Sequence, residues 1–122
     1  MVTEFIQHHS LVNSWINELR NVNTQADRLK FRRNMERIGE IAAYFISQDL
    51  AYQEVEIQTP LETVKVSDIS VQPVITTILR AGVPLFQGLL NYFDKADCGF
   101  VAAYRKHDAN DYFSIKQDYL TC

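Results

Sequence analysis

Hydrophobic residues in the first fifty positions recur with the three- and four-residue spacing of amphipathic helices. Within residues 5–20 this spacing places six residues on one face: Phe5, His8, Val12, Trp15, Ile16 and Leu19. A second helix should begin near Thr24, where Thr24 and Asp27 resemble a capping box, and should extend to about Leu50. Its buried stripe should contain Phe31, Met35, Ile38, Ala42 and Phe45. The pattern therefore predicts helices within residues 5–50.

From Glu54 onward the hydrophobic positions alternate with polar ones, as in a strand with one buried and one solvent-exposed face. A turn at residues 60–62, beginning with Pro60, separates two such segments. The alternating hydrophobic residues are Val55 and Ile57 before the turn, and Val64 and Val66 after it. The pattern predicts a β-hairpin over residues 54–67.

Residues 71–105 have the pattern of a β-α-β unit. Residues 71–79 are apolar nearly throughout, as expected of a parallel strand that helices cover on both faces. Pro84 then stands where the first residue of a helix would be, because its fixed φ suits that position. This helix should extend to about Phe93, and residues 99–104 should form the second strand.

Together the elements predict a single α/β domain over residues 1–122, with a parallel, Rossmann-like sheet after the helices and the hairpin. Residues 112–120 should add a more polar strand near a sheet edge. The sequence stops at that strand, where the sheet should still be growing. We therefore expect the domain to be incomplete at its C-terminus.

An arginine directly follows each strand of the β-α-β unit. Arg80 comes after the strand that ends at Leu79, and Arg105 after the strand that ends at Tyr104. Ligands of open α/β sheets bind beyond the carboxyl ends of the strands, so both guanidinium groups should face one crevice. Gly82 lies between them, in a loop whose amides and following helix N-terminus attract anions. Because arginine binds phosphate oxygens in pairs and stays charged, the pattern predicts a phosphate or pyrophosphate site.

Each arginine alone also has a simpler interpretation, as the surface partner of a carboxylate, and this alternative stays open. The sequence contains neither a Gly-Lys-Ser/Thr phosphate loop nor a Gly-x-Gly-x-x-Gly run. No pairing of a nucleophile with a base is evident, so we predict no catalytic nucleophile and no metal ligands.

Composition narrows the function classes. The chain has 12 Lys and Arg against 15 Asp and Glu, and a net charge of −3 argues against a general nucleic-acid binder. No apolar stretch approaches the ~20 residues that a membrane span needs, and no secretory signal is visible at the start. Two cysteines cannot form a disulfide framework, so we expect a reducing, cytoplasmic setting.

Other candidate residues have ordinary structural interpretations. His8 and His9 are adjacent and cannot form an i, i+4 metal pair, and His8 should be partly buried on the apolar face of its helix. His107 follows Arg105 in a predicted loop, where it is either solvated or in contact with a phosphate. Cys98 should be a small buried hydrophobic residue, and Cys122 has no nearby histidine to activate it.

The second predicted helix carries a run of basic residues. Acidic residues on the same helix offset this charge to about +1, which indicates a solvated, salt-bridged face. A subunit contact or a nucleotide-effector site is the alternative. The basic residues are Arg28, Lys30, Arg32, Arg33 and Arg37.

The run TILRAG, from Thr77 to Gly82, resembles the pyrophosphate-binding loop of uracil phosphoribosyltransferases, a family of type I phosphoribosyltransferases. Three further segments are similar to this family in the same order. Residues 27–40 resemble its N-terminal helix, and residues 54–61 resemble its hairpin. Residues 101–106 resemble the segment that ends in its second substrate-contacting arginine.

The resemblance implies a glycosyltransferase reaction of pyrimidine salvage, in which uracil and 5-phosphoribosyl-1-diphosphate (PRPP) give UMP and pyrophosphate. It implies that Arg80 and Arg105 contact PRPP, that backbone at Ala81 and Gly82 cradles the diphosphate, and that Mg²⁺ binds through PRPP. A cytoplasmic homodimer is implied as well, and the charge and hydropathy of the chain predict neither a membrane nor a nucleic-acid partner.

Members of this family continue to an acidic loop that holds the ribose 5′-phosphate and to a segment that recognises uracil. Residues 114–122 match neither, so the chain resembles the N-terminal, diphosphate-binding part of the enzyme, and we do not expect it to catalyse the reaction alone. Two alternatives stay open. One is a non-catalytic regulator of the same fold that binds a nucleotide or RNA, and the other is a structural fragment that needs a complementary chain and exposes an apolar sheet edge after residue 120.

Overall fold

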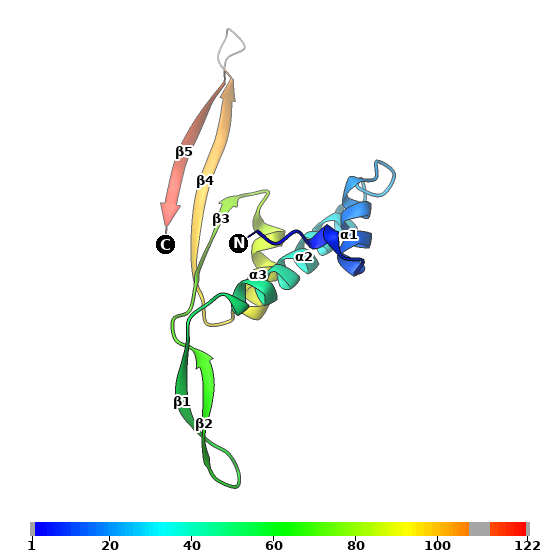
Figure 1. Cartoon of the computed structure of the whole chain (residues 1–122). Helices are drawn as coiled ribbons and strands as arrows, with labels where there is room; N and C mark the ends of the chain where they lie inside the picture. Colours follow the sequence, from blue (N-terminus) through cyan, green and yellow to red (C-terminus); the bar gives the residue numbers. More distant parts are fainter. Residues whose placement is uncertain (1, 108–112, 122) are drawn as a thin grey trace.

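The structure is a computed structural model that describes the backbone of residues 2–107 and 113–121 and the side chains of residues 2–105 and 115. A small helical and sheet core carries two long hairpins that extend away from it (Figure 1). The chain is mixed α/β, as the sequence predicts.

The first predicted helix begins later than its hydrophobic pattern indicates. A single 3-10 turn, η1 (Phe5–Gln7), precedes helix α1 (Leu11–Arg20). Ser10 starts α1 as its N-cap, since its Oγ accepts from the Val12 N–H at 3.2 Å and its own N–H donates to Asn13 Oδ1 at 3.2 Å. The predicted helix over residues 5–20 is therefore wrong in its first turns, and His8, predicted to be partly buried, is exposed.

Helix α2 (Arg28–Gln48) is capped by Asp27, whose carboxylate accepts from the Lys30 N–H at 3.0 Å. Thr24, the predicted start, lies outside the helix because its hydroxyl donates to the Glu18 carbonyl at 2.7 Å. The predicted buried stripe is also displaced, since Phe31 and Phe45 are 40% and 39% exposed. The buried residues of α2 are Asn34, Gly39 and Ala43.

Two different neighbours explain this displacement of the buried stripe. The Asn34 amide donates to the Glu18 carboxylate of α1 at 2.7 Å, so a polar side chain is fully buried where α1 crosses α2. Gly39 instead packs against the backbone of helix α3 (Val83–Tyr92), close to Gly88. Small and polar residues are therefore buried at the two crossings, while large apolar residues of α2 remain partly exposed.

The predicted hairpin is confirmed and is longer by two residues at each end. Strand β1 (Tyr52–Gln58) pairs antiparallel with β2 (Thr63–Ile69), with Val55 opposite Val66. The predicted buried face is wrong, because no residue of these two fully described strands is buried and Ile57 is 44% exposed. The hairpin extends beyond the helices, so neither of its faces is covered by them (Figure 1).

The remaining strands form one three-stranded sheet in the order β3-β4-β5. Strand β3 (Val74–Leu79) pairs parallel with β4 (Asp97–His107), and α3 connects them, which confirms the β-α-β unit. Strand β5 (Phe113–Thr121) pairs antiparallel with β4 at one edge, as predicted for residues 112–120.

Strand β3 is covered on one face and not on both, contrary to the sequence-based expectation. Ile75 and Thr77 are each 8% exposed, whereas Val74 and Ile78 are 55% and 61% exposed. Alternate residues of a strand point to opposite faces, and α3 packs against only one of them. The apolar residues of β3 therefore alternate between a buried face and a solvent-exposed face.

The hydrophobic core lies between α2, α3 and the sheet. Its buried members are Ala43, Ile75, Phe86 and Phe93, and half-buried Cys98 packs against them. The rings of Phe86 and Phe100 are 5.3 Å apart, which ties α3 to β4. This packing fixes α3, and with it the loop that joins β3 to α3.

Candidate anion-binding loop after strand β3

Residues 80–82 turn the chain sharply from β3 into α3. The Gly82 N–H donates to the Ile78 carbonyl at 3.2 Å, and the Val83 N–H donates to the Arg80 carbonyl at 3.2 Å. The peptide bond between Leu79 and Arg80 is cis. Gly82 is the N-cap of α3, and its carbonyl accepts from the Phe86 N–H at 3.0 Å. The loop is therefore held by hydrogen bonds to the end of β3 and to the first turn of α3.

Glycine is needed at position 82 because the loop folds back onto β3. A Cβ atom there would collide with the Thr77 hydroxyl oxygen and lie 3.0 Å from the Ile78 carbonyl oxygen. Thr77 is itself buried, so it has little room to move away. The Thr77 hydroxyl thus occupies the space that a side chain at position 82 would need.

The outer part of the loop is open to solvent. Arg80 and Ala81 are exposed, and the guanidinium of Arg80 forms no ion pair with any carboxylate in the described part of the chain. The Ala81 N–H has no acceptor among the described residues, whereas the Gly82 N–H is directed to the strand. An amide and an arginine without partners in the described part of the chain therefore adjoin the N-terminus of α3, which suits an anionic ligand.

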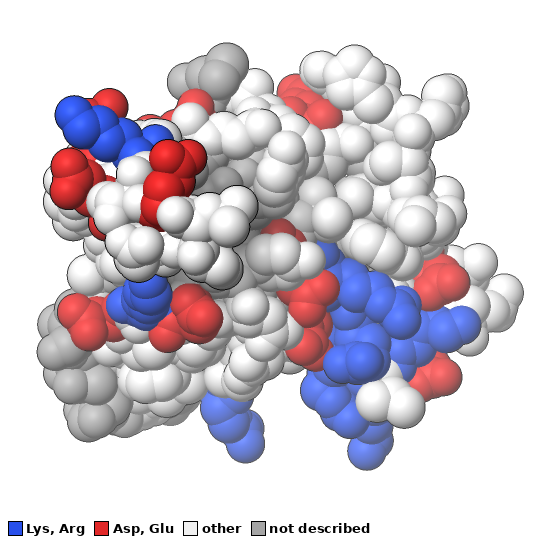
Figure 2. Space-filling view, turned by 90° about the horizontal axis from the view of Figure 1, so that it is seen from below, with Lys and Arg blue, Asp and Glu red and all other residues white. Residues whose placement is uncertain are grey.

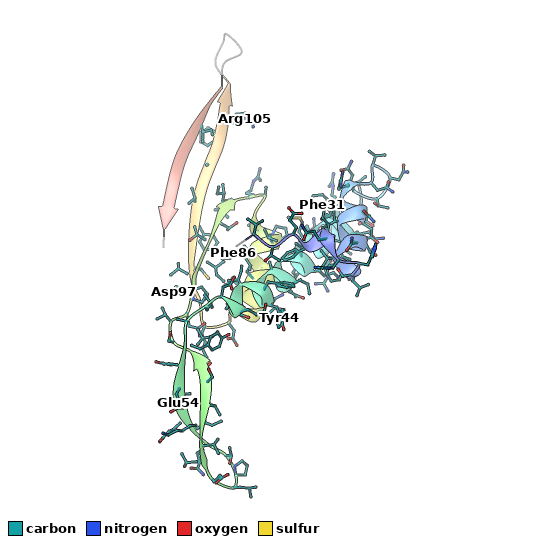
Figure 3. All side chains as sticks on the ribbon, in the orientation of Figure 1. Phe31, Tyr44, Glu54, Phe86, Asp97 and Arg105 are labelled. Atoms are coloured by element: carbon teal, nitrogen blue, oxygen red, sulfur yellow. The ribbon has the colours of Figure 1, made fainter. Side chains whose placement is uncertain are left out.

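Arg105 lies at a different level from Arg80. Leu79 is in register with Ala102, so Arg105 is two residues beyond the level of Arg80, or about 7 Å along the strand. Strand β4 does not end at Tyr104, as predicted, because it continues to His107 by pairing with β5, with Arg105 opposite Ile115. Figure 3 shows Arg105 on the part of β4 that extends past the end of β3.

The two arginines therefore lie at different levels of the sheet, about two residues apart along the strand direction. Arg80 lies on the short connection at the core, and Arg105 is exposed on the β4–β5 hairpin. His107, predicted in a loop, is the last residue of β4, and its side chain is outside the described part, as is Cys122. A ligand that touches both guanidinium groups has to extend from the loop along the hairpin.

The described residues contain no group of three or more histidine, cysteine, aspartate or glutamate side chains arranged to hold a metal ion. Of the described helices, none is long and apolar enough to cross a lipid bilayer.

The basic residues of α2 gather on one side of the molecule (Figure 2). Three of them have partners: Lys30 lies 4.0 Å from Glu18, Arg33 lies 3.2 Å from Glu36, and Arg37 donates to Asn34 at 3.0 Å. These contacts support the interpretation of a solvated, salt-bridged face. The other two, Arg28 and Arg32, form no ion pair with a described residue and border a shallow hollow of about 330 Å³ together with Phe31.

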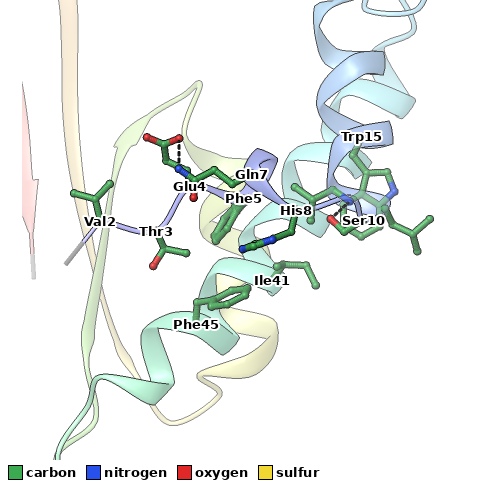
Figure 4. Close-up of a pocket in the computed structure, with 12 residues that line it drawn as sticks. Val2, Thr3, Glu4, Phe5, Gln7, His8, Ser10, Trp15, Ile41 and Phe45 are labelled. Atoms are coloured by element: carbon green, nitrogen blue, oxygen red, sulfur yellow. Dashed lines mark hydrogen bonds between the residues drawn. The ribbon is translucent and has the colours of Figure 1, made fainter.

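A larger cavity, of about 530 Å³, was not predicted from the sequence. It lies between the N-terminal segment, α1 and α2, and its lining includes Phe5, Trp15 and Phe45 (Figure 4). The helix predicted over residues 5–20 left no space for it, and the Ser10 cap was the signal for the break in the chain. No residue of the loop at 80–82 lines this cavity, so it is separate from the candidate anion site.

Comparisons with known proteins agree with this fold. A family model described as uracil phosphoribosyltransferase matches residues 6–118. The chain is 46% identical over 112 residues to a uracil phosphoribosyltransferase of Porphyromonas gingivalis, covering 92% of this chain and 52% of that protein. It is 37% identical over 108 residues to a uracil phosphoribosyltransferase of Methanococcus maripaludis, covering 86% of this chain and 45% of that protein.

A solved structure, that of the AQ2163 protein from Aquifex aeolicus, shares the fold with a TM-score of 0.78 at 24% identity. The similarity covers 100% of this chain and 56% of that one. The chain thus spans about half the length of the curated relatives it matches.

Proposed function

The chain belongs to the uracil phosphoribosyltransferase family, and from this we propose that it supplies the diphosphate-binding side of a site that converts uracil and PRPP to UMP and pyrophosphate. In this reaction a uracil ring nitrogen forms a bond to the anomeric carbon of PRPP. The bond from that carbon to the diphosphate breaks, and the ring nitrogen loses its proton. The diphosphate leaves with an additional negative charge.

The observation that carries the proposal is the open outer side of the loop at residues 80–82. Arg80 has no carboxylate partner among the described residues, and the adjacent Ala81 N–H has no acceptor there. Positive groups that are fixed before the reaction stabilise the charge that develops on a leaving group, because they need no reorganisation. We propose that the Arg80 guanidinium and the Ala81 N–H bind oxygens of the diphosphate.

Gly82 has a different role in this proposal. Its N–H is used by the Ile78 carbonyl, so it holds the loop closed while the Ala81 N–H faces the ligand. The close approach of Gly82 to Thr77 keeps the N-terminus of α3 near the bound anion. Such a helix N-terminus adds a favourable electrostatic contribution to anion binding.

Arg105 is proposed as a second contact to PRPP, from the β4–β5 hairpin. Its position about two residues beyond the level of Arg80 suits a ligand longer than a single phosphate. We propose that Mg²⁺ enters as part of the substrate, bound to the PRPP oxygens, following the family. No covalent nucleophile is required of this chain.

We further propose a cytoplasmic homodimer as the working form, following the family. The residues that hold the ribose 5′-phosphate and recognise uracil are not assigned to this chain. We propose that they belong to the part of the family's sequence that the chain does not cover.

The test of this function is the substitution Arg80→Ala in the complete enzyme, with turnover measured at varied PRPP. We expect kcat/KM for PRPP to fall by ~100-fold or more, because a charged hydrogen-bond partner of the leaving group is lost. Arg28→Ala is the matched control, since Arg28 is also an exposed arginine without an ion pair among the described residues but lies on α2. Unchanged kinetics of the Arg80 variant would contradict the proposal.

A second candidate function is a regulator of the same fold that binds a nucleotide or RNA. It is favoured by the pair Arg28 and Arg32, which border a hollow beside the 40% exposed Phe31. Binding titrations of Arg80→Ala and Arg28→Ala with PRPP and with RNA distinguish the enzyme from the regulator. Loss of RNA binding in Arg28→Ala, with PRPP binding undetectable in the unmodified chain, would favour the regulator.

A further inference from the structure

We propose that the cavity beside the N-terminal segment is a binding site for an uncharged aromatic molecule of two fused rings that carries one hydroxyl or N–H group. The cavity measures about 530 Å³ and lies between the N-terminal segment, α1 and α2. The loop at residues 80–82 does not contribute to its lining, so this inference is independent of the proposed reaction of PRPP.

The first argument is the size of the cavity and its aromatic lining. An engineered cavity of about 150 Å³ admits benzene, and natural ligand pockets usually measure about 300–1,000 Å³. A cavity of about 530 Å³ therefore has room for more than one ring. Phe5, Trp15 and Phe45 line it, and the ring centres of Phe5 and Phe45 lie 5.3 Å apart. Such rings pack against an aromatic ligand by offset stacking or edge-to-face contact.

The second argument is the charge around the cavity. Among the described lining residues, Glu4 is the only Asp, Glu, Lys or Arg. Its carboxylate accepts from the Gln7 amide at 3.0 Å, and Figure 4 shows it directed away from the Phe5 ring. An anionic ligand would thus lose its hydration without meeting a cation, and a cationic ligand would face Arg37, whose guanidinium lies 5.9 Å from the centre of the Trp15 ring. The cavity therefore suits an uncharged molecule.

The third argument is the polar group that points into the cavity. Figure 4 shows the His8 imidazole directed toward the space between Phe5 and Ile41. The imidazole forms no hydrogen bond with another side chain or backbone group of the described residues. An uncharged imidazole has one N–H donor and one acceptor nitrogen, so it pairs with either a hydroxyl or an N–H group. His8 therefore supplies the contact that would orient the ligand.

The fourth argument is the way the N-terminal segment closes one side of the cavity. The described polar contact between this segment and α1 is a long hydrogen bond, in which the Asn13 amide donates to the Ile6 carbonyl at 3.5 Å. The contact between the Phe5 and Phe45 rings joins the segment to α2. A segment held by so few contacts opens at low cost, so a ligand can enter by displacing it.

The experiment is a calorimetric titration of the chain of residues 1–122 with three probes of the same ring system: naphthol, naphthalene and naphthoate. We expect saturable one-to-one binding of naphthol. Naphthalene should bind more weakly because it cannot pair with His8, and naphthoate should bind about tenfold more weakly or not at all because its charge is not compensated. Absence of saturable naphthol binding, or naphthoate binding as tight as that of naphthol, would overturn the proposal.

The two adjacent histidines provide a matched pair of variants. His8→Ala should weaken naphthol binding by about fivefold, the effect of one hydrogen bond, and should leave naphthalene binding unchanged. His9→Ala is the control, because His9 is also exposed but does not line the cavity, and it should leave both unchanged. Equal effects of the two variants on naphthol binding would overturn the proposal, as would an equal loss of naphthol and naphthalene binding in the His8 variant.

A second pair of variants tests the location of the ligand. Ile41→Phe should abolish naphthol binding, because half-buried Ile41 lines the cavity and the larger ring would fill it. Ile46→Phe is the control on the same helix, since Ile46 is 45% exposed and does not line the cavity. Naphthol binding retained in a folded Ile41 variant would overturn the proposal. If the Ile41 variant does not fold, the histidine pair still decides the question, because both histidines are exposed.

Two further measurements separate this inference from other possibilities. A dimer of the unmodified chain that Ile41→Phe converts to a monomer would show in light scattering that a second copy fills the cavity, which overturns the proposal. In the complete enzyme, His8→Ala should leave kcat/KM for PRPP unchanged, and a large fall would overturn the independence of the two sites. Naphthol binding by a chain whose Arg80→Ala variant keeps its PRPP kinetics would leave this inference standing and contradict the proposed function.

Discussion

At the scale of single residues, the candidate site depends on the contact between Gly82 and Thr77. A Cβ at position 82 would meet the buried Thr77 hydroxyl, so Gly82→Ala forces a shift of the loop. We expect this substitution to lower the free energy of unfolding by about 1–3 kcal/mol, the usual range for overpacking. Urea denaturation measures the change.

A double variant provides the control for this prediction. Thr77→Ala removes the oxygen that the new Cβ would meet, so Gly82→Ala should cost less in that background than in the unmodified chain. The difference between the two costs is the coupling energy of the pair. Equal costs in both backgrounds would contradict the proposed clash.

Residue-scale features of the site could be predicted only where they are local in sequence. Arg80, Ala81 and Gly82 are consecutive, so a strand followed by a helix was enough to place them together. The position of Arg105 depends on where β4 ends, and this is decided by pairing with β5 rather than by residues near Arg105. The direction of the Gly82 N–H toward Ile78 is likewise a property of the folded loop and has no sequence signal.

At the scale of elements, the crossing of α2 and α3 positions the candidate anion-binding loop. Gly39 and Gly88 face each other there, and a Cβ on Gly39 would lie 3.1 Å from the Gly88 Cα. A Cβ on Gly88 would collide with the Glu36 carbonyl oxygen and lie 3.0 Å from the Glu40 nitrogen. Asn91 reinforces the crossing by donating to the Glu36 and Glu40 carboxylates at 2.9 and 2.8 Å.

We therefore expect Gly88→Ala to destabilise the protein by about 2–3 kcal/mol, toward the upper end of overpacking effects because backbone atoms obstruct it. In an exposed helix the same change would stabilise by up to about 1 kcal/mol, so the two interpretations differ in sign. Thermal unfolding followed by circular dichroism measures the effect. Ser14→Ala, at an exposed position of α1, should leave the midpoint nearly unchanged, and a stabilised Gly88 variant would show that the helices do not approach closely.

The elements themselves were largely predictable, while the surfaces they bury were not. The hairpin and the β-α-β unit were predicted because alternation and turn residues are local signals. The buried stripe of α2 could not be predicted in this way, because it depends on two neighbouring helices, α1 and α3. Small and polar residues of α2 allow these helices to approach closely. The apolar run of β3 predicts a strand covered on both faces, because periodicity does not reveal whether a second covering layer is present.

At the scale of the whole molecule, the core is small compared with the hairpins that extend from it. The buried hydrophobic cluster of Ala43, Ile75, Phe86 and Phe93 joins the second half of α2, α3 and β3, whereas no residue of β1 or β2 is buried. Local opening is cheapest where few apolar side chains are buried and the backbone is open to solvent. Protection from exchange should therefore differ strongly along this chain.

We expect amide hydrogen exchange to be slowest in α3 and in the second half of α2, which packs into the core. Exchange should be at least tenfold faster in the β1–β2 hairpin. Mass spectrometry of peptides from timed exchange measures this directly. Uniform protection across both parts would contradict it and would indicate that something covers the hairpin in solution. The expected order also bears on the site, since α3 begins directly after Arg80–Gly82 and a protected α3 keeps one end of that loop fixed. The rigid part of the molecule would then be the part that carries the proposed diphosphate site, with Arg105 on a separate hairpin.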